Sequence, residues 1–266
     1  MKKMIIGTIT VLAGLYLLLC VALFFLQENL IFFPEKLDAS YRFQFTESFE
    51  ELTFQAPDGK HLNGLLFKSD SSKGLVFYLH GNAGSLSSWG YVADTYTSLG
   101  YDVFILDYRG FGKSEGNISS QAQLFEDNQM IYNEFKKRYR EEDIIVLGYS
   151  IGTGLASKLA SDNHPSQLIL QAPYYSLTDM MRQRFSFVPT FLLKYKFETH
   201  EYLKNCDMPI TIFHGEVDQV IHYTSSLKLK EEFRDQIDLI PLKGQGHNGI
   251  TDNGHYQQEL KRLLQD

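Results

Sequence analysis

Apolar positions beyond residue 45 fall into short runs that alternate with longer segments of mixed polarity. A short continuous apolar run is typical of a strand that is buried on both faces of a parallel sheet. The runs with this pattern are 75–79, 103–106, 144–147, 168–170 and 210–213, and a last strand is expected at 237–242. Segments with helical character lie near 86–98, 119–140, 152–162, 222–233 and 255–264. The alternation predicts one doubly wound, mostly parallel α/β sheet flanked by helices.

The first two strands of this region have a different arrangement. Glu51–Ala56 and His61–Lys68 flank the turn Pro57-Asp-Gly-Lys60. Two strand-like segments joined by a short Asp-Gly turn are typical of a β-hairpin. An antiparallel pair is therefore expected to precede the parallel strands.

The N-terminus carries an uncharged apolar stretch from Met4 to Leu26. As a helix this stretch would be about 34 Å long, which is enough to cross the hydrocarbon core of a membrane. A cleaved signal peptide is the alternative, but its apolar region is usually about 7–15 residues long and ends in a small-x-small cleavage site. The stretch here is longer and has no such site, so an uncleaved membrane anchor is predicted.

The anchor defines the expected domain organisation. Residues 1–27 are predicted to form the anchor, 28–44 a juxtamembrane connector and 45–266 a catalytic domain, with a short cap segment near 174–205. Two lysines, at positions 2 and 3, precede the apolar stretch. Because basic residues favour the cytoplasmic side, the N-terminus is expected in the cytoplasm and the catalytic domain on the opposite face of the membrane.

Charge and cysteine content exclude several classes of function. The net charge is −7, and the basic run Lys136–Arg140 lies on a helix of mixed charge, so nucleic-acid binding is not expected. Cys20 lies within the apolar stretch, which makes a disulfide with Cys206 implausible. Neither cysteine has neighbours at metal-ligand spacing. No metal and no cofactor are therefore predicted, and the sequence leaves the oligomeric state open.

Candidate chemistry begins at Gly148-Tyr-Ser-Ile-Gly152, directly after the strand at 144–147. A serine nucleophile needs this spacing on a sharp turn from strand to helix, because side chains at the two glycine positions would collide with neighbouring backbone. The small residues after Gly152 favour a helix packed closely on the sheet. The positive end of that helix's dipole, at its N-terminus, would face a developing oxyanion. Ser150 is therefore predicted to be a nucleophile.

A serine hydroxyl needs a base to take its proton, and the base needs an acid to orient it. Asp218 follows the strand at 210–213 and His247 follows the strand at 237–242. Ligands bind at such strand ends in open α/β sheets, so Ser150, Asp218 and His247 are predicted to form a catalytic triad. The alternatives for the base and the acid are His222, Glu216, Asp179 and Asp252.

These motifs together resemble the α/β-hydrolase superfamily, and most closely its membrane-anchored Bem46-like serine hydrolases. The resemblance runs from about residue 27 to the C-terminus. It rests on Gly148-Tyr-Ser-Ile-Gly, His80-Gly-Asn-Ala-Gly, Asp107-Tyr-Arg-Gly-Phe-Gly-Lys-Ser, His214-Gly-Glu-Val-Asp and Gly246-His-Asn. It implies the α/β-hydrolase fold and the chain order of the triad. It does not specify a substrate.

The resemblance also implies that the loop His80–Gly84 supplies an oxyanion donor. A glycine-rich turn lets backbone N–H groups approach a ligand closely. The backbone N–H groups of Asn82 and Ile151 are expected to form the oxyanion hole, with Ala83 as the alternative to Asn82. His80 itself is expected to be structural, with its ring bonded to backbone within the loop.

The expected substrate is a small-molecule or lipid-like acyl compound. The cap segment is rich in aromatic residues and methionine, which suits an acyl group, although such segments are also found simply packed. An anchored site beside a membrane favours esters or thioesters, cleaved through an acyl-enzyme. A peptidase or amidase is the second hypothesis, and a non-catalytic scaffold on the same fold is the third.

Overall fold

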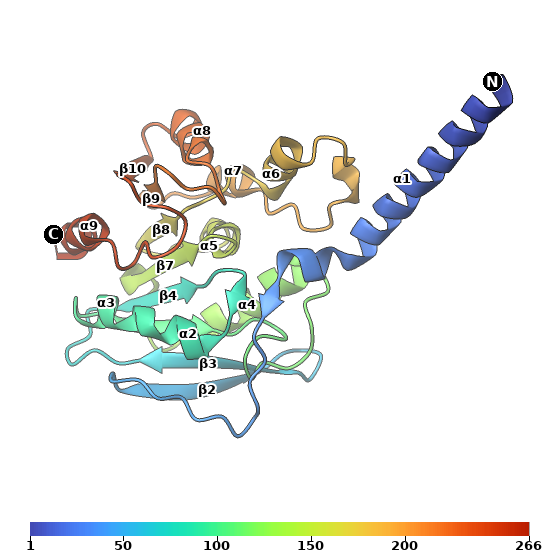
Figure 1. Ribbon diagram of the computed structural model, residues 1–266. Helices are drawn as coiled ribbons and strands as arrows, with labels where there is room; N and C mark the ends of the chain where they lie inside the picture. Colours follow the sequence, from blue (N-terminus) through green and yellow to red (C-terminus); the bar gives the residue numbers. More distant parts are fainter. Residues whose placement is uncertain (266) are drawn as a thin grey trace.

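The computed structural model describes residues 1–265, and an eight-stranded sheet forms the centre of this part of the chain (Figure 1). The strand order is β10-β9-β8-β7-β4-β6-β3-β2. The strands are β2 (Phe49–Gln55), β3 (His61–Phe67), β4 (Leu75–Leu79), β6 (Asp102–Leu106), β7 (Ile144–Tyr149), β8 (Gln167–Gln171), β9 (Ile210–Gly215) and β10 (Ile237–Leu242). Pairing is parallel from β6 to β10 and antiparallel for β2–β3 and β3–β6. The predicted mostly parallel sheet and its hairpin are confirmed.

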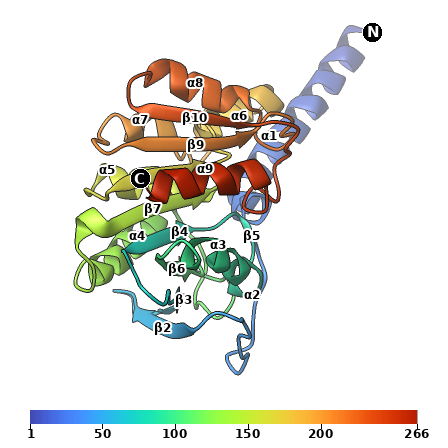
Figure 2. The same ribbon diagram turned by 90° about the vertical axis from the view of Figure 1, so that its left-hand side faces the viewer.

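Helices cover both faces of the sheet (Figure 2). One face packs against α4 (Gln121–Phe135), α5 (Gly152–Ser161), α7 (Thr199–Leu203) and α8 (Thr224–Glu232). The other face packs against α2 (Leu86–Trp89), α3 (Ala93–Thr97) and α9 (Gly254–Gln265). Strand β4 shows how both cores are filled, because its side chains alternate between them: Leu75, Phe77 and Leu79 enter the first core, and Val76 and Tyr78 enter the second.

The segment predicted as one helix near 86–98 is divided. A 3₁₀ turn at Gly90–Val92 separates α2 from α3. The ring of Phe45 packs against Gly90, where a Cβ atom would lie 2.2 Å from a ring carbon. The glycine both permits this close contact and weakens the helix at that point.

The segment between β8 and β9 carries α6 (Leu177–Arg184), a 3₁₀ turn at Thr190–Leu192 and α7. Its aromatic side chains divide into two groups. Tyr174, Tyr195 and Phe197 are fully buried, whereas Phe185, Phe187 and Phe191 are 52%, 60% and 80% exposed. The segment 185–193 therefore has apolar side chains that the protein itself does not cover.

The N-terminal helix α1 (Lys2–Ile31) projects away from the rest of the molecule in Figure 1 and returns to it at its C-terminal end. Of the helices within residues 1–265, it is the one long and apolar enough to cross a membrane. After α1, the short strand β1 (Phe33–Pro34) pairs in parallel with β5 (Ala83–Gly84). The segment that follows the apolar helix is thus attached to the loop after β4.

Candidate active site

Ser150 occupies a sharp turn between β7 and α5. Its φ is 53°, in the left-handed region that a non-glycine residue rarely adopts. Hydrogen bonds hold the turn on both sides: the Ser150 N–H donates to the Gln171 carbonyl at 2.9 Å, and the Thr153 N–H donates to the Ser150 carbonyl at 3.0 Å. Strain of this kind persists where surrounding structure over-determines it, and it is typical of functional sites.

The two glycines of the turn are required by close packing. A Cβ at Gly148 would lie 2.5 Å from the carbonyl oxygen of Gly152. A Cβ at Gly152 would lie 2.0 Å from the carbonyl oxygen of Leu79. Both distances are shorter than any real contact of a Cβ atom, and the obstructing atoms are backbone atoms that cannot move aside. The collision predicted from the sequence is confirmed at both positions.

The three side chains predicted to form a triad lie in one hydrogen-bonded line. Nε2 of His247 is 2.9 Å from Oγ of Ser150, and Nδ1 of His247 is 2.7 Å from Oδ2 of Asp218. The hydroxyl of Tyr149 donates to the carbonyl of His247 and holds the loop that carries the imidazole. With Nδ1–H donated to the carboxylate, Nε2 is left to accept the serine proton. The geometry permits proton transfer from Ser150 to His247.

Asp218 is buried, and its two carboxylate oxygens have separate partners. Oδ1 accepts from the backbone N–H groups of Val220 at 2.7 Å and Ile221 at 2.9 Å, while Oδ2 faces His247. Burial acts to raise the pKa of Asp218, but hydrogen bonds from His214 and His247 outweigh it and hold that pKa well below its usual range. Asp218 therefore stays ionised across the physiological pH range.

His214 is a contributor to the site that the sequence reasoning did not single out. Its fully buried ring lies with Nε2 3.3 Å from Oδ2 of Asp218, and the same nitrogen is 2.9 Å from the carbonyl of Ile221. Nδ1 is 2.6 Å from the hydroxyl of Ser226. The sequence feature that could have identified His214 is its position at the end of β9, four residues before Asp218. His214 thus contacts the same carboxylate oxygen of Asp218 as His247 does.

The alternative acids and base do not join this line. Glu216 and His222 are exposed, as is Asp252. Both carboxylate oxygens of Asp179 bond to the Lys228 ammonium on α8. The residue with a carboxylate against His247 is Asp218.

The loop after β4 is held by the last residue of α1 and by the segment that follows it. The Phe33 N–H donates to the Asn82 carbonyl at 2.8 Å, and the Asn82 side-chain amide donates to the Ile31 carbonyl at 2.8 Å. Within residues 1–265, the backbone N–H groups of Asn82 and Ile151 donate to no backbone carbonyl. Both residues line the same pocket as Ser150, whereas Ala83 belongs to β5. The N–H groups of Asn82 and Ile151 are thus free to serve a ligand at Ser150.

His80 has the structural role expected for it. Its ring is fully buried, and Nδ1 lies 2.7 Å from the carbonyl of Gly81 in the same loop. Burial lowers the pKa of His80 to about 4, so the imidazole is neutral at neutral pH and Nδ1–H donates to that carbonyl. The hydroxyl of Tyr108 donates to the His80 carbonyl at 2.9 Å, which adds a second constraint on the loop.

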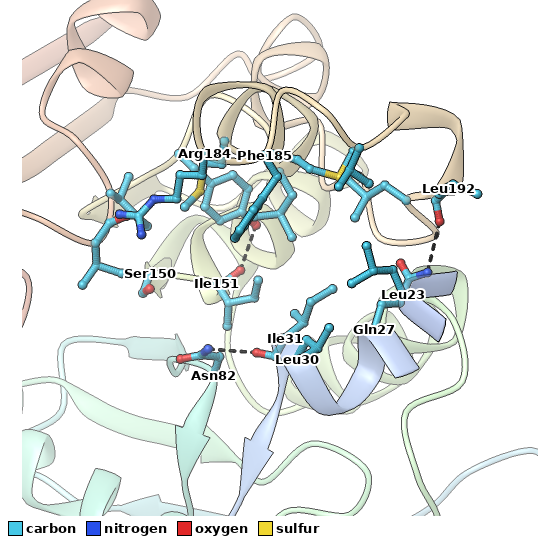
Figure 3. A pocket seen from close by; sticks show the side chains of 18 of the residues that line it. Leu23, Gln27, Leu30, Ile31, Asn82, Ser150, Ile151, Arg184, Phe185 and Leu192 are labelled. Atoms are coloured by element: carbon cyan, nitrogen blue, oxygen red, sulfur yellow. Dashed lines mark hydrogen bonds between the residues drawn. The ribbon is translucent and has the colours of Figure 1, made fainter. Parts of the chain in front are cut away.

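A pocket of about 590 Å³ opens at Ser150 and extends between the segment 177–193 and the end of α1 (Figure 3). Its lining is almost entirely apolar, with leucine, isoleucine, methionine, phenylalanine and valine side chains predominating. Among residues 1–265, Arg184 is the one charged side chain in the lining. Its guanidinium donates to the carbonyls of Gln219 at 2.6 Å and Val220 at 2.7 Å, which ties α6 to the loop of Asp218. Such a pocket suits a predominantly apolar ligand.

Within residues 1–265, no group of three or more His, Cys, Asp or Glu side chains could hold a metal ion. The polar groups next to the Ser150 hydroxyl are the imidazole of His247 and, behind it, the carboxylate of Asp218. The backbone N–H groups of Asn82 and Ile151 belong to residues that line the same pocket.

Known proteins are similar to this chain in sequence, and solved structures are similar to it in fold. Alpha/beta hydrolase domain-containing protein 17B of Xenopus laevis is 30% identical over 200 residues, covering 73% of this chain and 67% of that protein. Lysophosphatidylserine lipase ABHD12 of Mus musculus is 28% identical over 228 residues, covering 74% of this chain and 56% of that protein. The structure of the Pyrococcus furiosus esterase Pf2001 matches with a TM-score of 0.71 at 17% identity, covering 88% of this chain and 97% of the esterase.

A family model described as serine aminopeptidase, S33, matches residues 70–203, which is half of the chain. The matched region includes the loop after β4, the turn at Ser150 and most of the segment between β8 and β9. The chain therefore belongs to the serine aminopeptidase S33 family, within the α/β-hydrolase superfamily that the sequence motifs predicted.

Proposed function

We propose that this protein hydrolyses carboxylic esters or thioesters of lipid-like acyl groups through an acyl-enzyme on Ser150. The observation that carries the proposal is the hydrogen-bonded line from Ser150 through His247 to Asp218, opening directly into an apolar pocket. The names of similar proteins, a lysophosphatidylserine lipase and an esterase, support the same class of reaction.

The proposed reaction has two steps. Oγ of Ser150 attacks the acyl carbon while Nε2 of His247 takes its proton, and the N–H groups of Asn82 and Ile151 stabilise the oxyanion. His247 then returns the proton to the departing alcohol or thiol, leaving the acyl group on Ser150. A water molecule, deprotonated by His247, attacks this ester, and His247 passes the proton to Oγ of Ser150 as the carboxylic acid is released. Asp218 holds the imidazole and stabilises its charged form throughout.

The family description names an aminopeptidase, so an amidase is the second candidate. An aminopeptidase binds the free, charged α-amino group of its substrate, which requires a nearby acceptor or negative charge. The pocket at Ser150 has no Asp or Glu among the lining residues that residues 1–265 provide, and its single charged member is cationic. This lining favours an uncharged acyl group over a peptide N-terminus.

The proposal predicts a specific order of substrates. Full-length protein in detergent or nanodiscs is offered p-nitrophenyl esters, acyl thioesters and aminoacyl amides, and a fluorophosphonate probe is mapped to its site by mass spectrometry. Esters or thioesters are expected to be hydrolysed and the probe is expected on Ser150. Cleavage of the amides alone would reverse the ranking of the two candidates, and a probe adduct on any other residue would refute the mechanism.

We also propose that the N-terminus lies in the cytoplasm and the hydrolase domain on the opposite face of the membrane, on the basis of Lys2 and Lys3. Protease added to sealed, right-side-out membrane preparations is expected to digest the hydrolase domain. Digestion only after the cytoplasmic face is opened would reverse the orientation.

A further inference from the structure

The apolar helix α1 forms part of the wall of the pocket at Ser150. Leu19, Leu23 and Gln27 line the pocket, and their spacing of four residues places them along one face of the helix. Leu30 and Ile31 continue the wall as far as Asn82. Figure 3 shows Leu23, Gln27 and Leu30 on the side of the pocket across from Phe185. The helix is therefore a component of the site as well as a candidate anchor.

Polar contacts hold this wall against the segment 185–195. The buried Gln27 amide donates to the carbonyl of Leu192 at 3.1 Å and accepts from the Lys194 N–H at 2.8 Å. The Lys194 ammonium is 2.8 Å from the carboxylate of Glu28. Nearer the N-terminus, the Tyr16 hydroxyl donates to the carbonyl of Phe187 at 2.7 Å. These contacts, from Tyr16 to Glu28, span about three and a third turns of α1, so the helix and the segment form one fixed unit.

The position of these residues along α1 sets their depth in a bilayer. The uncharged stretch ends at Leu26. At a rise of 1.5 Å per residue, Leu19 lies about 10 Å inside this end and Leu23 about 5 Å inside it. Ile31, whose carbonyl bonds to Asn82, lies about 8 Å outside it. The pocket thus extends from hydrocarbon depth at Leu19 to the level of the headgroups near Ser150.

The segment that faces α1 has the composition of a membrane-inserted loop. Residues 185–193 carry no charge, and their three phenylalanines are at least half exposed. Four cations flank this stretch, two on either side: Arg182, Arg184, Lys194 and Lys196. Apolar side chains in the acyl region with cations at the headgroups are typical of protein segments that lie in the membrane interface.

We propose that the pocket opens into the bilayer between α1 and the segment 185–193, and that the acyl chain of a membrane lipid enters it from the leaflet along Leu19 and Leu23. The ester or thioester carbonyl then reaches Ser150 at headgroup level, without the chain crossing water. This inference rests on the proposed hydrolysis at Ser150. It assigns the substrate to lipids that carry their acyl group within the membrane, and it makes α1 part of the specificity pocket.

The first test narrows the pocket on the side formed by α1. Full-length Leu23→Trp is compared with Leu17→Trp, whose site is exposed and lies about 200° around the helix from Leu19. Wild type is expected to prefer long acyl chains, by about fourfold in kcat/KM per added methylene until the pocket is filled. Leu23→Trp is expected to lower the ratio of kcat/KM for a palmitoyl ester to that for an acetyl ester at least tenfold. Leu17→Trp is expected to leave that ratio unchanged. Equal ratios in the two variants would overturn the proposal.

The second test concerns entry from the bilayer. Phe191→Glu places a charge in the exposed loop without altering a residue that lines the pocket, and Leu227→Glu makes the same change on α8. With the palmitoyl ester carried in phosphatidylcholine vesicles, Phe191→Glu is expected to lower its hydrolysis at least fivefold relative to soluble acetyl ester. Leu227→Glu is expected to match wild type. Entry from the leaflet would be refuted if hydrolysis of the palmitoyl ester fell in neither variant, or fell equally in both.

Hydrolysis of the acetyl ester distinguishes failure of this inference from failure of the proposed function. A protein that hydrolyses acetyl ester and accepts the fluorophosphonate probe, yet shows no effect of Leu23→Trp on chain length, retains the proposed function and loses the inference. A protein that cleaves neither ester and takes no probe loses both.

Discussion

Ser150→Ala is expected to lower kcat for ester hydrolysis by about 10⁶-fold, because alanine provides no oxygen to form the acyl-enzyme. Substrate binding should persist, since the pocket is unchanged by removal of one buried hydroxyl oxygen. A small residual rate over the uncatalysed reaction is expected from the oxyanion donors that remain. The measurement is steady-state hydrolysis of p-nitrophenyl acetate, with Ser161→Ala at the end of α5 as the matched control.

His247→Ala extends the same prediction. Serine and histidine act as one unit, so the double variant Ser150→Ala/His247→Ala is expected to be no slower than either single variant. Additive losses would contradict a shared step and would indicate that the 2.9 Å contact between the two side chains is not used in catalysis. Activity of Ser150→Ala near that of wild type would exclude Ser150 as the nucleophile.

Asp218→Asn is expected to lower kcat by about 10⁴-fold with little change in the fold. An amide at this position still accepts from Val220 and Ile221, but it can present N–H to His247 in place of a carboxylate oxygen. The imidazole then carries its proton on Nε2. A protonated Nε2 has no free lone pair, so it cannot accept the proton of Ser150. Hydrolysis across pH is the measurement, with Glu216→Gln, an exposed acid two residues away, as the control.

The pH dependence of Asp218 has a definite sign. The pKa of Asp218 is lower in the folded protein than in the unfolded chain. At any pH above the unfolded-state pKa, the ionised carboxylate therefore stabilises the fold in full. This stabilisation is lost as the pH falls through the folded-state pKa. The acid limb of the activity profile near neutrality is therefore not expected to come from this carboxylate. A loss of activity in Glu216→Gln equal to that in Asp218→Asn would contradict the assignment of the acid.

Much of the sheet was predictable because strands buried on both faces leave an unmistakable pattern. The runs at 75–79, 144–147 and 210–213 all lie within observed strands, and the glycines around Ser150 predicted the turn between β7 and α5. These features depend on short segments of sequence. Periodicity, turn chemistry and the order of strand ends are enough to define them.

Other features depend on the three-dimensional course of loops and on contacts between segments far apart in the sequence. The contact of His214 with Asp218 arises only when the loop after β9 folds back. The helices α6 and α7 are eight and five residues long, which is too short for a sequence pattern to define them. Arg184 and the loop of Asp218 are joined by bonds to backbone carbonyls, which no residue pattern specifies. Such contacts could not be read from the residues around them.

The sequence alone determined the class of sheet, the turn that presents Ser150 and the presence of an apolar N-terminal helix, because each is encoded by neighbouring residues. Only the tertiary structure decided that the helix lines the pocket, since residues 19–31 meet 185–195 across more than 150 positions of sequence. Gln27 is a polar residue within an apolar helix, and its local bond, to the Phe24 carbonyl at 3.0 Å, does not explain why it lies there. Its two bonds to the segment at Leu192 and Lys194 give the physical reason.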